Sequence, residues 1–202
     1  MLHTYSLGRA TQYYPEGTAL ASDGRRSTFR ELNGRVGRIA GALKKRGFKR
    51  GDRLAILLPN EPDYIELVYA CTWLGLVAVP LNTRLSIPEM DHVLTDAAPH
   101  GLVRHSALAA PKVRPPLEVV LDQEPLHLDE GFGPDPIYDP DAILALIYTS
   151  GTTGRPKGVA LTHANVVENI YHLSYWLPFW NGAVYLHAAP MFHIADFPMM
   201  FA

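Results

Sequence analysis

The residues of this chain whose types and spacing could do chemistry lie at 148–158, where the sequence is Tyr-Thr-Ser-Gly-Thr-Thr-Gly-Arg-Pro-Lys-Gly. Glycine adopts backbone conformations closed to other residues and leaves N–H groups that an anion can approach. Hydroxyl groups add further donors, and a lysine adds a positive charge. The candidate phosphate-binding residues are therefore Thr149, Ser150, Gly151, Thr152, Thr153, Gly154 and Lys157.

Two interpretations of this stretch compete. Segments rich in glycine, serine and threonine are usually flexible surface turns. However, a hydrogen bond to an ionised group contributes about 1.5–3 kcal/mol, so several that converge on a polyphosphate make a binding site. The apolar run at 143–147 leads directly into the stretch, and a linker would not normally be entered in that way. The sequence therefore favours a phosphate-binding loop.

The loop does not match the Walker A pattern of P-loop nucleotidases. That pattern has glycine directly before the lysine and a helix after the following Ser or Thr. Here Pro156 precedes Lys157, Gly158 follows it, and the apolar residues 159–161 are typical of a strand. We therefore expect the loop to join two strands.

Strands and helices alternate along the chain. Thr28 and Glu31, and again Ser86 and Glu89, have the spacing of a capping box, which predicts a helix at each pair. Asn60 is expected to cap a helix that lies between these two. Apolar strands are predicted at 54–58, 76–81, 101–103, 119–121 and 142–148, with another at 183–188. Together these elements predict an α/β fold in which a mostly parallel sheet is flanked by helices.

The segment from about residue 107 to residue 140 has a different composition from its neighbours. Prolines recur in it, and acidic residues accumulate there and just after it: Asp122, Glu124, Asp129, Glu130, Asp135, Asp139 and Asp141. A metal site is conceivable, but carboxylates scattered along a proline-rich loop are usually solvated. We interpret the whole chain, 1–202, as one partial domain that contains this loop.

Composition excludes several classes of function. The net charge of −2 over 202 residues gives no electrostatic case for binding nucleic acid or an anionic membrane surface. No apolar run approaches the length of a membrane span, so no transmembrane segment is expected. The single cysteine, Cys71, lies in an apolar stretch and is expected to be a buried thiol in a reducing, cytoplasmic protein. The sequence leaves a homodimer open as an assembly state.

The chain ends within an apolar run at 197–201. Domains seldom end on an unprotected apolar segment, so this end is expected to be a cut through a longer protein.

Five stretches together resemble the adenylate-forming superfamily, which includes acyl-CoA synthetases, luciferase-like enzymes and the adenylation domains of peptide synthetases. Residues 148–158 are similar to the signature loop of that superfamily. The other four are similar to its motifs in the same order: 51–60 (GDRLAILLPN), 76–82 (LVAVPLN), 161–165 (LTHAN) and 189–193 (APMFH). The resemblance covers nearly the whole chain. The stretch from Pro190 to His193, together with Asp196, favours an acyl-CoA synthetase over a peptide-synthetase adenylation domain.

The resemblance implies a two-step, AMP-forming ligase. A carboxylic acid would attack the α-phosphorus of ATP to give an acyl-adenylate and pyrophosphate, and coenzyme A would then displace AMP. The loop would bind the β- and γ-phosphates, and Thr149 would help to coordinate Mg²⁺. Phe192 and His193 would lie near the acyl pocket or the adenylate; the alternative for His193 is a structural residue at a strand end.

Members of this superfamily are more than twice as long as this chain. Their later motifs supply a Mg²⁺ carboxylate, an aspartate for the ribose, a hinge and a C-terminal domain with a catalytic lysine, and none of these is expected within the 202 residues of this chain. We therefore expect this chain to contact phosphate without completing a turnover. The alternatives are a non-catalytic nucleotide-binding module, a peptide-synthetase adenylation domain and, more weakly, a kinase or P-loop nucleotidase. The acid is expected to be fatty or aromatic, since Trp176, Phe179, Trp180 and Phe192 are apolar, but helix packing explains the first three equally well.

Overall fold

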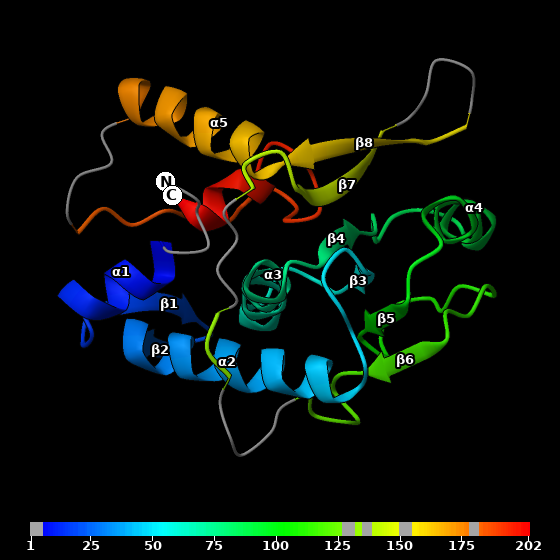
Figure 1. The fold of residues 1–202 in the computed structure, drawn as a ribbon, viewed down its shortest axis with the longest axis horizontal. Helices are drawn as coiled ribbons and strands as arrows, with labels where there is room; N and C mark the ends of the chain where they lie inside the picture. Colours follow the sequence, from blue (N-terminus) through cyan, green and yellow to red (C-terminus); the bar gives the residue numbers. More distant parts are fainter. Residues whose placement is uncertain (1–5, 127–131, 135–138, 150–154, 178–181) are drawn as a thin grey trace.

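A six-stranded sheet forms the centre of the fold (Figure 1). The computed structural model describes residues 6–126, 132–134, 139–149, 155–177 and 182–202. In spatial order the strands are β6 (Leu117–Val120), β5 (Gly101–Arg104), β3 (Arg53–Leu57), β4 (Val77–Pro80), β7 (Ile143–Thr149) and β8 (Lys157–Thr162). Neighbouring strands are parallel except β7 and β8, which are antiparallel. The predicted α/β fold with a mostly parallel sheet is confirmed.

Helices cover both faces of the sheet. Leu54 and Ile56 of β3 belong to one apolar cluster, which includes residues of α2 (Phe29–Lys45) and α3 (Pro62–Leu74). Their neighbours Ala55 and Leu57 belong to a second cluster with α4 (Ile87–Ala97). Successive residues of a strand point to opposite faces, so β3 is buried on both sides, as its unbroken apolar sequence predicts.

Local sequence signals set the ends of these helices. The hydroxyl of Thr28 accepts a hydrogen bond from the Glu31 N–H, and the Glu31 carboxylate accepts one from the Thr28 N–H, which completes the predicted capping box of α2. At α4, the Glu89 carboxylate accepts from both the N–H and the hydroxyl of Ser86. Gly75 ends α3 with φ 66°, in the left-handed region that favours glycine.

The prediction for Asn60 is wrong. Glu61 occupies the N-cap position of α3 and makes no side-chain capping bond. Pro62 at the start of the helix has no N–H to be capped, which reduces the need for a cap. The Asn60 side chain is instead hydrogen-bonded to a segment more than 120 residues later in the sequence.

The N-terminal part contains a helix that the sequence patterns did not predict, α1 (Ser6–Tyr13), followed by the hairpin of β1 (Thr18–Ser22) and β2 (Arg25–Thr28). The helix has 8 residues, which is too short for a helical period to be recognised in the sequence, and only Leu7 of it is buried.

The C-terminal part differs from the expectation in two places. The strand predicted at 183–188 is absent: these residues form no ladder with any described strand, and Val184 is 95% exposed. A strand also needs a partner strand, and an apolar segment alone does not show whether it has one. The terminal run forms the 3₁₀ helix η2 (Phe197–Phe201) and is buried, so it is not the unprotected segment we expected.

Two further expectations concern Cys71 and the membrane. Cys71 is buried, and burial raises the pKa of its thiol to about 12, as suits a structural thiol. Over the described ranges, no helix combines the length and apolar character that crossing a bilayer requires.

Candidate functional site

The β7–β8 hairpin brings two of the predicted phosphate-binding residues opposite each other. Thr149 ends β7, Lys157 begins β8, and the two are paired across the antiparallel ladder. Both are exposed. Ser150, Gly151, Thr152, Thr153 and Gly154 lie outside the described residues. The described part of the site therefore presents a hydroxyl group and an ammonium group at the same end of the hairpin.

Tyr148, directly before Thr149, has a fixed orientation. A Cβ atom at Gly158, its partner across the ladder, would lie 2.9 Å from Cζ of the Tyr148 ring, so the ring lies against the glycine. The Tyr148 hydroxyl donates a 2.6 Å hydrogen bond to Asp96 of α4. Burial raises the pKa of Tyr148, and the hydrogen bond to Asp96 and its charge raise it further. Tyr148 is therefore a neutral hydrogen-bond donor at neutral pH.

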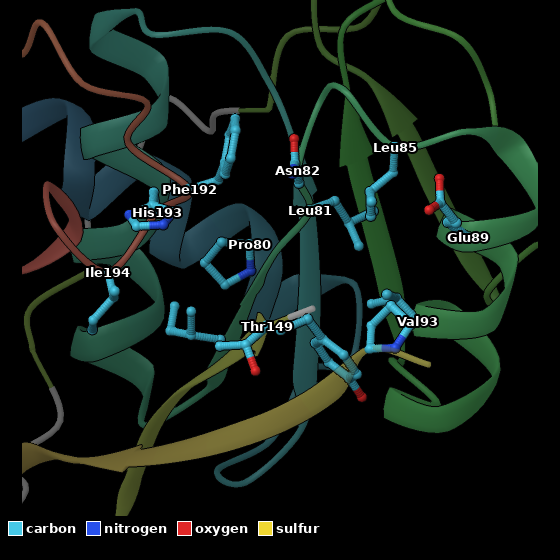
Figure 2. A pocket seen from close by; sticks show the side chains of 13 residues that line it. Pro80, Leu81, Asn82, Leu85, Glu89, Val93, Thr149, Phe192, His193 and Ile194 are labelled. Atoms are coloured by element: carbon cyan, nitrogen blue, oxygen red, sulfur yellow. The ribbon is translucent and has the colours of Figure 1, made fainter. Parts of the chain in front are cut away.

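A cavity of about 330 Å³ lies beside Thr149. Residues at the carboxyl ends of β4 and β7 line this cavity. Open parallel sheets bind ligands at this edge. Figure 2 shows Phe192, His193 and Ile194 on one side of the cavity and Leu85, Glu89 and Val93, in or next to α4, on the other. The structure thus brings Thr149, Phe192 and His193, predicted separately, to one cavity.

A backbone hydrogen bond orients the His193 ring. Its Nδ1 accepts a hydrogen bond of 3.2 Å from the N–H of Ala195. A neutral imidazole that accepts at Nδ1 carries its proton on Nε2. His193 is exposed at the cavity, so Nε2–H is available to donate to an oxygen atom of a bound ligand.

Asn60 fixes the segment that leads to His193. Its Nδ2 donates to the carbonyl oxygens of His187 at 3.1 Å and of Ala189 at 2.7 Å. Its Oδ1 accepts from the N–H of Met191 at 2.9 Å. One side chain shortly after β3 thus satisfies three backbone groups of a segment that pairs with no described strand.

Asp196 fixes the same segment from its other end. Its side chain is fully buried and accepts hydrogen bonds from the Tyr185 hydroxyl at 2.9 Å and from His187 Nδ1 at 2.7 Å. Burial raises the pKa of Tyr185, and the hydrogen bond to Asp196 and its charge act in the same direction. A buried carboxylate needs such partners, because an unpaired charge is costly away from water.

Sequence reasoning missed the roles of Asn60, Asp96 and Asp196 in building this site. The signal for Asp196 was present, since it is the one carboxylate within the otherwise mostly apolar 190–201. Asn60 follows a buried strand, where either a helix cap or a long-range contact was possible. Nothing in the sequence paired Asp96 with Tyr148.

The described donors at this site, a hydroxyl group and an ammonium group, are of kinds that can bind phosphate. Over the described parts of the chain, no group of three or more His, Cys, Asp or Glu side chains could hold a metal ion. Mg²⁺ usually keeps several waters and binds through one or two protein oxygens plus the phosphates of a substrate. The exposed hydroxyl of Thr149, opposite Lys157, is compatible with such a shared ion.

Comparison with known proteins identifies relatives over nearly the whole chain. The family model described as "AMP-binding enzyme" matches residues 7–202. A feruloyl-CoA synthase from Amycolatopsis sp is 38% identical over 202 residues, which is 95% of this chain and 40% of that protein. A long-chain-fatty-acid–CoA ligase from Mycobacterium tuberculosis is 34% identical over 183 residues, which is 84% of this chain and 36% of that protein.

Solved structures agree. The o-succinylbenzoate coenzyme A synthetase from Bacillus subtilis, in complex with ATP and magnesium ion, superimposes with a TM-score of 0.85 at 30% identity. The match covers 97% of this chain and 53% of the chain in that structure. The chain thus spans about 40% of the length of the two curated relatives.

Proposed function

This chain belongs to the AMP-binding enzyme family, and from that premise we propose that it forms the N-terminal part of an AMP-forming acid–thiol ligase. Such an enzyme activates a carboxylic acid with ATP to an acyl-adenylate and transfers the acyl group to coenzyme A. The observation that carries the proposal is that Thr149, which is paired with Lys157 across the hairpin, lines the same cavity as His193.

The proposed phosphate site consists of Thr149, Ser150, Gly151, Thr152, Thr153, Gly154 and Lys157. Support comes from the antiparallel pairing of Thr149 with Lys157, which places a hydroxyl donor and a cation on facing strands. In this arrangement Lys157 neutralises charge on the β- and γ-phosphates, and Thr149 donates to a phosphate oxygen or shares Mg²⁺ with it. Bound Mg²⁺ would supply further neutralisation of the triphosphate charge.

Neutralisation matters because the reaction brings together two anions, a carboxylate and a triphosphate. Holding the phosphates fixed and partly neutralised lets the carboxylate oxygen approach the α-phosphorus in line with the departing pyrophosphate. A new carboxyl O–P bond forms as the bond between the α-phosphorus and the bridging oxygen breaks, and no protein nucleophile is needed. In the second step the thiol of coenzyme A attacks the acyl carbon, and AMP leaves.

His193 and Phe192 have different roles in the proposed acyl or adenylate pocket. His193 Nε2–H donates to an oxygen of the carboxylate or the adenylate, while Phe192 supplies apolar surface. Leu85 and Ile194 extend that surface within the cavity, so we propose an aromatic or fatty acid as substrate. Of the other aromatics predicted for an acyl group, Trp176 is 82% exposed on α5 (His163–Trp176), and Phe179 and Trp180 lie outside the described residues.

We propose that turnover needs the segments that follow this part in the longer relatives. A direct test joins residues 1–202 to the C-terminal remainder of the Amycolatopsis feruloyl-CoA synthase and measures exchange of labelled pyrophosphate into ATP with a panel of aromatic and fatty acids. We expect exchange with at least one acid in the chimaera and none with residues 1–202 alone. Lys157→Ala should reduce the exchange about tenfold or more.

The same experiment separates the rival functions. A non-catalytic nucleotide-binding module predicts Mg·ATP binding without exchange for any acid, and a kinase predicts ADP in place of AMP. A peptide-synthetase adenylation domain predicts transfer to a carrier-protein thiol in place of coenzyme A. Exchange by residues 1–202 alone would contradict the requirement for a further segment.

We further propose a cytoplasmic location, because a single, buried cysteine suits a reducing compartment. A homodimer is proposed as the assembly to test by light scattering.

A further inference from the structure

The end of the β7–β8 hairpin that carries Thr149 and Lys157 receives little support from the sheet. β7 is in register with β4 at Ala145, well before Thr149. β8 is the edge strand, paired with β7 alone, and residues 157–160 are exposed. Apolar burial therefore fixes the position of this end only weakly.

Helix α4 makes side-chain hydrogen bonds to β7 and to Pro156, the residue directly before β8. Asp96 accepts a 2.6 Å bond from the hydroxyl of Tyr148, which precedes Thr149. His92 Nε2 lies 3.3 Å from the carbonyl oxygen of Pro156, which precedes Lys157, a distance that fits donation from a ring N–H. Within the described ranges, these are the side-chain hydrogen bonds that join the end of the hairpin to another element.

The spacing of the two α4 residues makes the double contact possible. Residues four apart lie on the same face of a helix, so His92 and Asp96 face the same neighbour. That neighbour is the end of the hairpin, where one contact is to Tyr148 of β7 and the other to Pro156, directly before β8. The Tyr148 ring reaches Asp96 while it lies against Gly158, where a larger residue would displace it.

The helix itself is held in place by other parts of the chain. Met90, Val93 and Leu94 are buried in the second apolar cluster. The Asp91 carboxylate accepts the N–H groups of Lys112 and Val113 at 2.7 and 2.8 Å. A helix fixed in this way provides a stable reference for the hairpin.

We propose that His92 and Asp96 are positioning residues that set where Thr149 and Lys157 lie relative to the cavity, and thereby set the affinity of the site for Mg·pyrophosphate and Mg·ATP. This inference rests on the proposed function, because it assumes that Thr149 and Lys157 bind phosphate. It assigns no phosphate contact to His92 or Asp96. They act through Pro156 and Tyr148.

The experiment measures binding of Mg·pyrophosphate and of Mg·ATP to residues 1–202 by titration calorimetry. His92→Ala and Asp96→Ala each remove one contact. His92→Gln keeps an N–H donor, and Asp96→Asn keeps an acceptor oxygen. The matched control is Thr95→Ala, on the same helix, whose exposed hydroxyl donates to the carbonyl of Asp91 in that helix.

We expect each alanine variant to weaken binding about fivefold, the value of one modest hydrogen bond, and the double variant to weaken it further. Asp96→Asn, His92→Gln and Thr95→Ala should bind within about twofold of the wild type. Wild-type affinity in both alanine variants would overturn the proposal. Equal losses in Asp96→Ala and Asp96→Asn would also overturn it, because charge and not the hydrogen bond would then be responsible.

A second readout needs no ligand. Amide hydrogen exchange of Ile147 and Val159, which face each other in the hairpin, should accelerate in the alanine variants. Exchange of Ala55 and Ile56 in β3 should not change. If the wild-type chain binds neither phosphate ligand, the proposed phosphate site fails, and the exchange rates still decide whether α4 holds the hairpin. Unchanged rates in the double variant would overturn the proposal whatever the ligand data.

Discussion

Two regions of this molecule are held together by different physical means. In the first, α2, α3 and α4 pack on β3, β4 and β5, and every residue from Tyr64 to Leu74 of α3 is buried. In the second, formed by β8, α5 and residues 182–196, only His163 and Val166 of α5 are buried. Figure 1 shows α5 and β8 on one side of the molecule, away from α2, β5 and β6.

The candidate site residues lie in or beside the less buried region, at the end of the β7–β8 hairpin and in the turn at 190–194. Polar side chains of the first region reach them. Asn60 holds the segment before His193, and His92 and Asp96 hold the hairpin. Burial thus builds the scaffold, while a few hydrogen bonds position the residues that would do chemistry. Because the two roles are separate, residues at the site can change without loss of the apolar core.

The largest expected difference between the two regions concerns apolar side chains. Leu67 of α3 is fully buried, whereas Leu186 is 79% exposed. Leu67→Ala should lower the free energy of unfolding by about 3 kcal/mol, because it removes buried methyl groups and leaves a cavity. Leu186→Ala should change it by less than about 0.5 kcal/mol. Urea unfolding followed by circular dichroism measures both. Similar losses would show that both regions depend on burial equally.

His163 is the point where the second region enters the buried interior. Burial lowers the pKa of His163 to about 4, from an ordinary value near 6.5. Below about pH 6.5 the unfolded chain therefore binds a proton that the folded chain binds only near pH 4, so stability falls as the pH decreases through that window. Between pH 7 and pH 5 the loss should be about 2 kcal/mol.

His163→Gln should remove this part of the pH dependence, and the difference between wild type and variant isolates it from other titrating groups. His172→Gln, at an exposed position of the same helix, is the matched control and should keep the wild-type slope. Urea unfolding at pH 7, 6 and 5 gives the three slopes. A slope that is the same in all three proteins would mean that His163 stays accessible to protons in the folded state.

The scaffold was more predictable from the sequence than the site. The two capping boxes, Thr28 with Glu31 and Ser86 with Glu89, are local sequence patterns, and the unbroken apolar run of β3 is one as well. The helices α2 and α4 and the strand β3 were therefore predicted correctly. The strand expected at 183–188 failed because pairing depends on an edge elsewhere in the fold. Asn60 and Asp96 form hydrogen bonds with residues between 52 and 131 positions away. Asp196 bonds to residues 9 and 11 positions away, in a segment without regular secondary structure. No local sequence pattern encodes these pairings.

Asp196 tests whether polar contacts in the second region carry stability. Asp196→Ala removes the acceptor for the Tyr185 hydroxyl and for His187 Nδ1. Because both donors are partly accessible to water, the loss should be about 1.5 kcal/mol, within the usual range for a broken polar contact. Glu168→Ala, an exposed position on α5, should be neutral. An unfolding free energy that is unchanged in Asp196→Ala would show that the buried carboxylate costs as much as its bonds return.

Asn60 gives the smallest expected change in stability and the sharpest test of positioning. Asn60→Ala removes the donor to the carbonyls of His187 and Ala189 and the acceptor for the Met191 N–H. Because Asn60 is exposed, water can replace these partners, and the loss should be only about 1 kcal/mol. The turn that carries His193 should nevertheless lose its fixed position, since the segment before it forms no ladder with a described strand. The imidazole resonances of His193 in proton–carbon spectra should therefore shift or broaden. Asn169→Ala, on the exposed side of α5, should leave these resonances and the unfolding free energy unchanged. Sharp, unshifted His193 resonances in Asn60→Ala would place the control of this turn with Asp196 and η2.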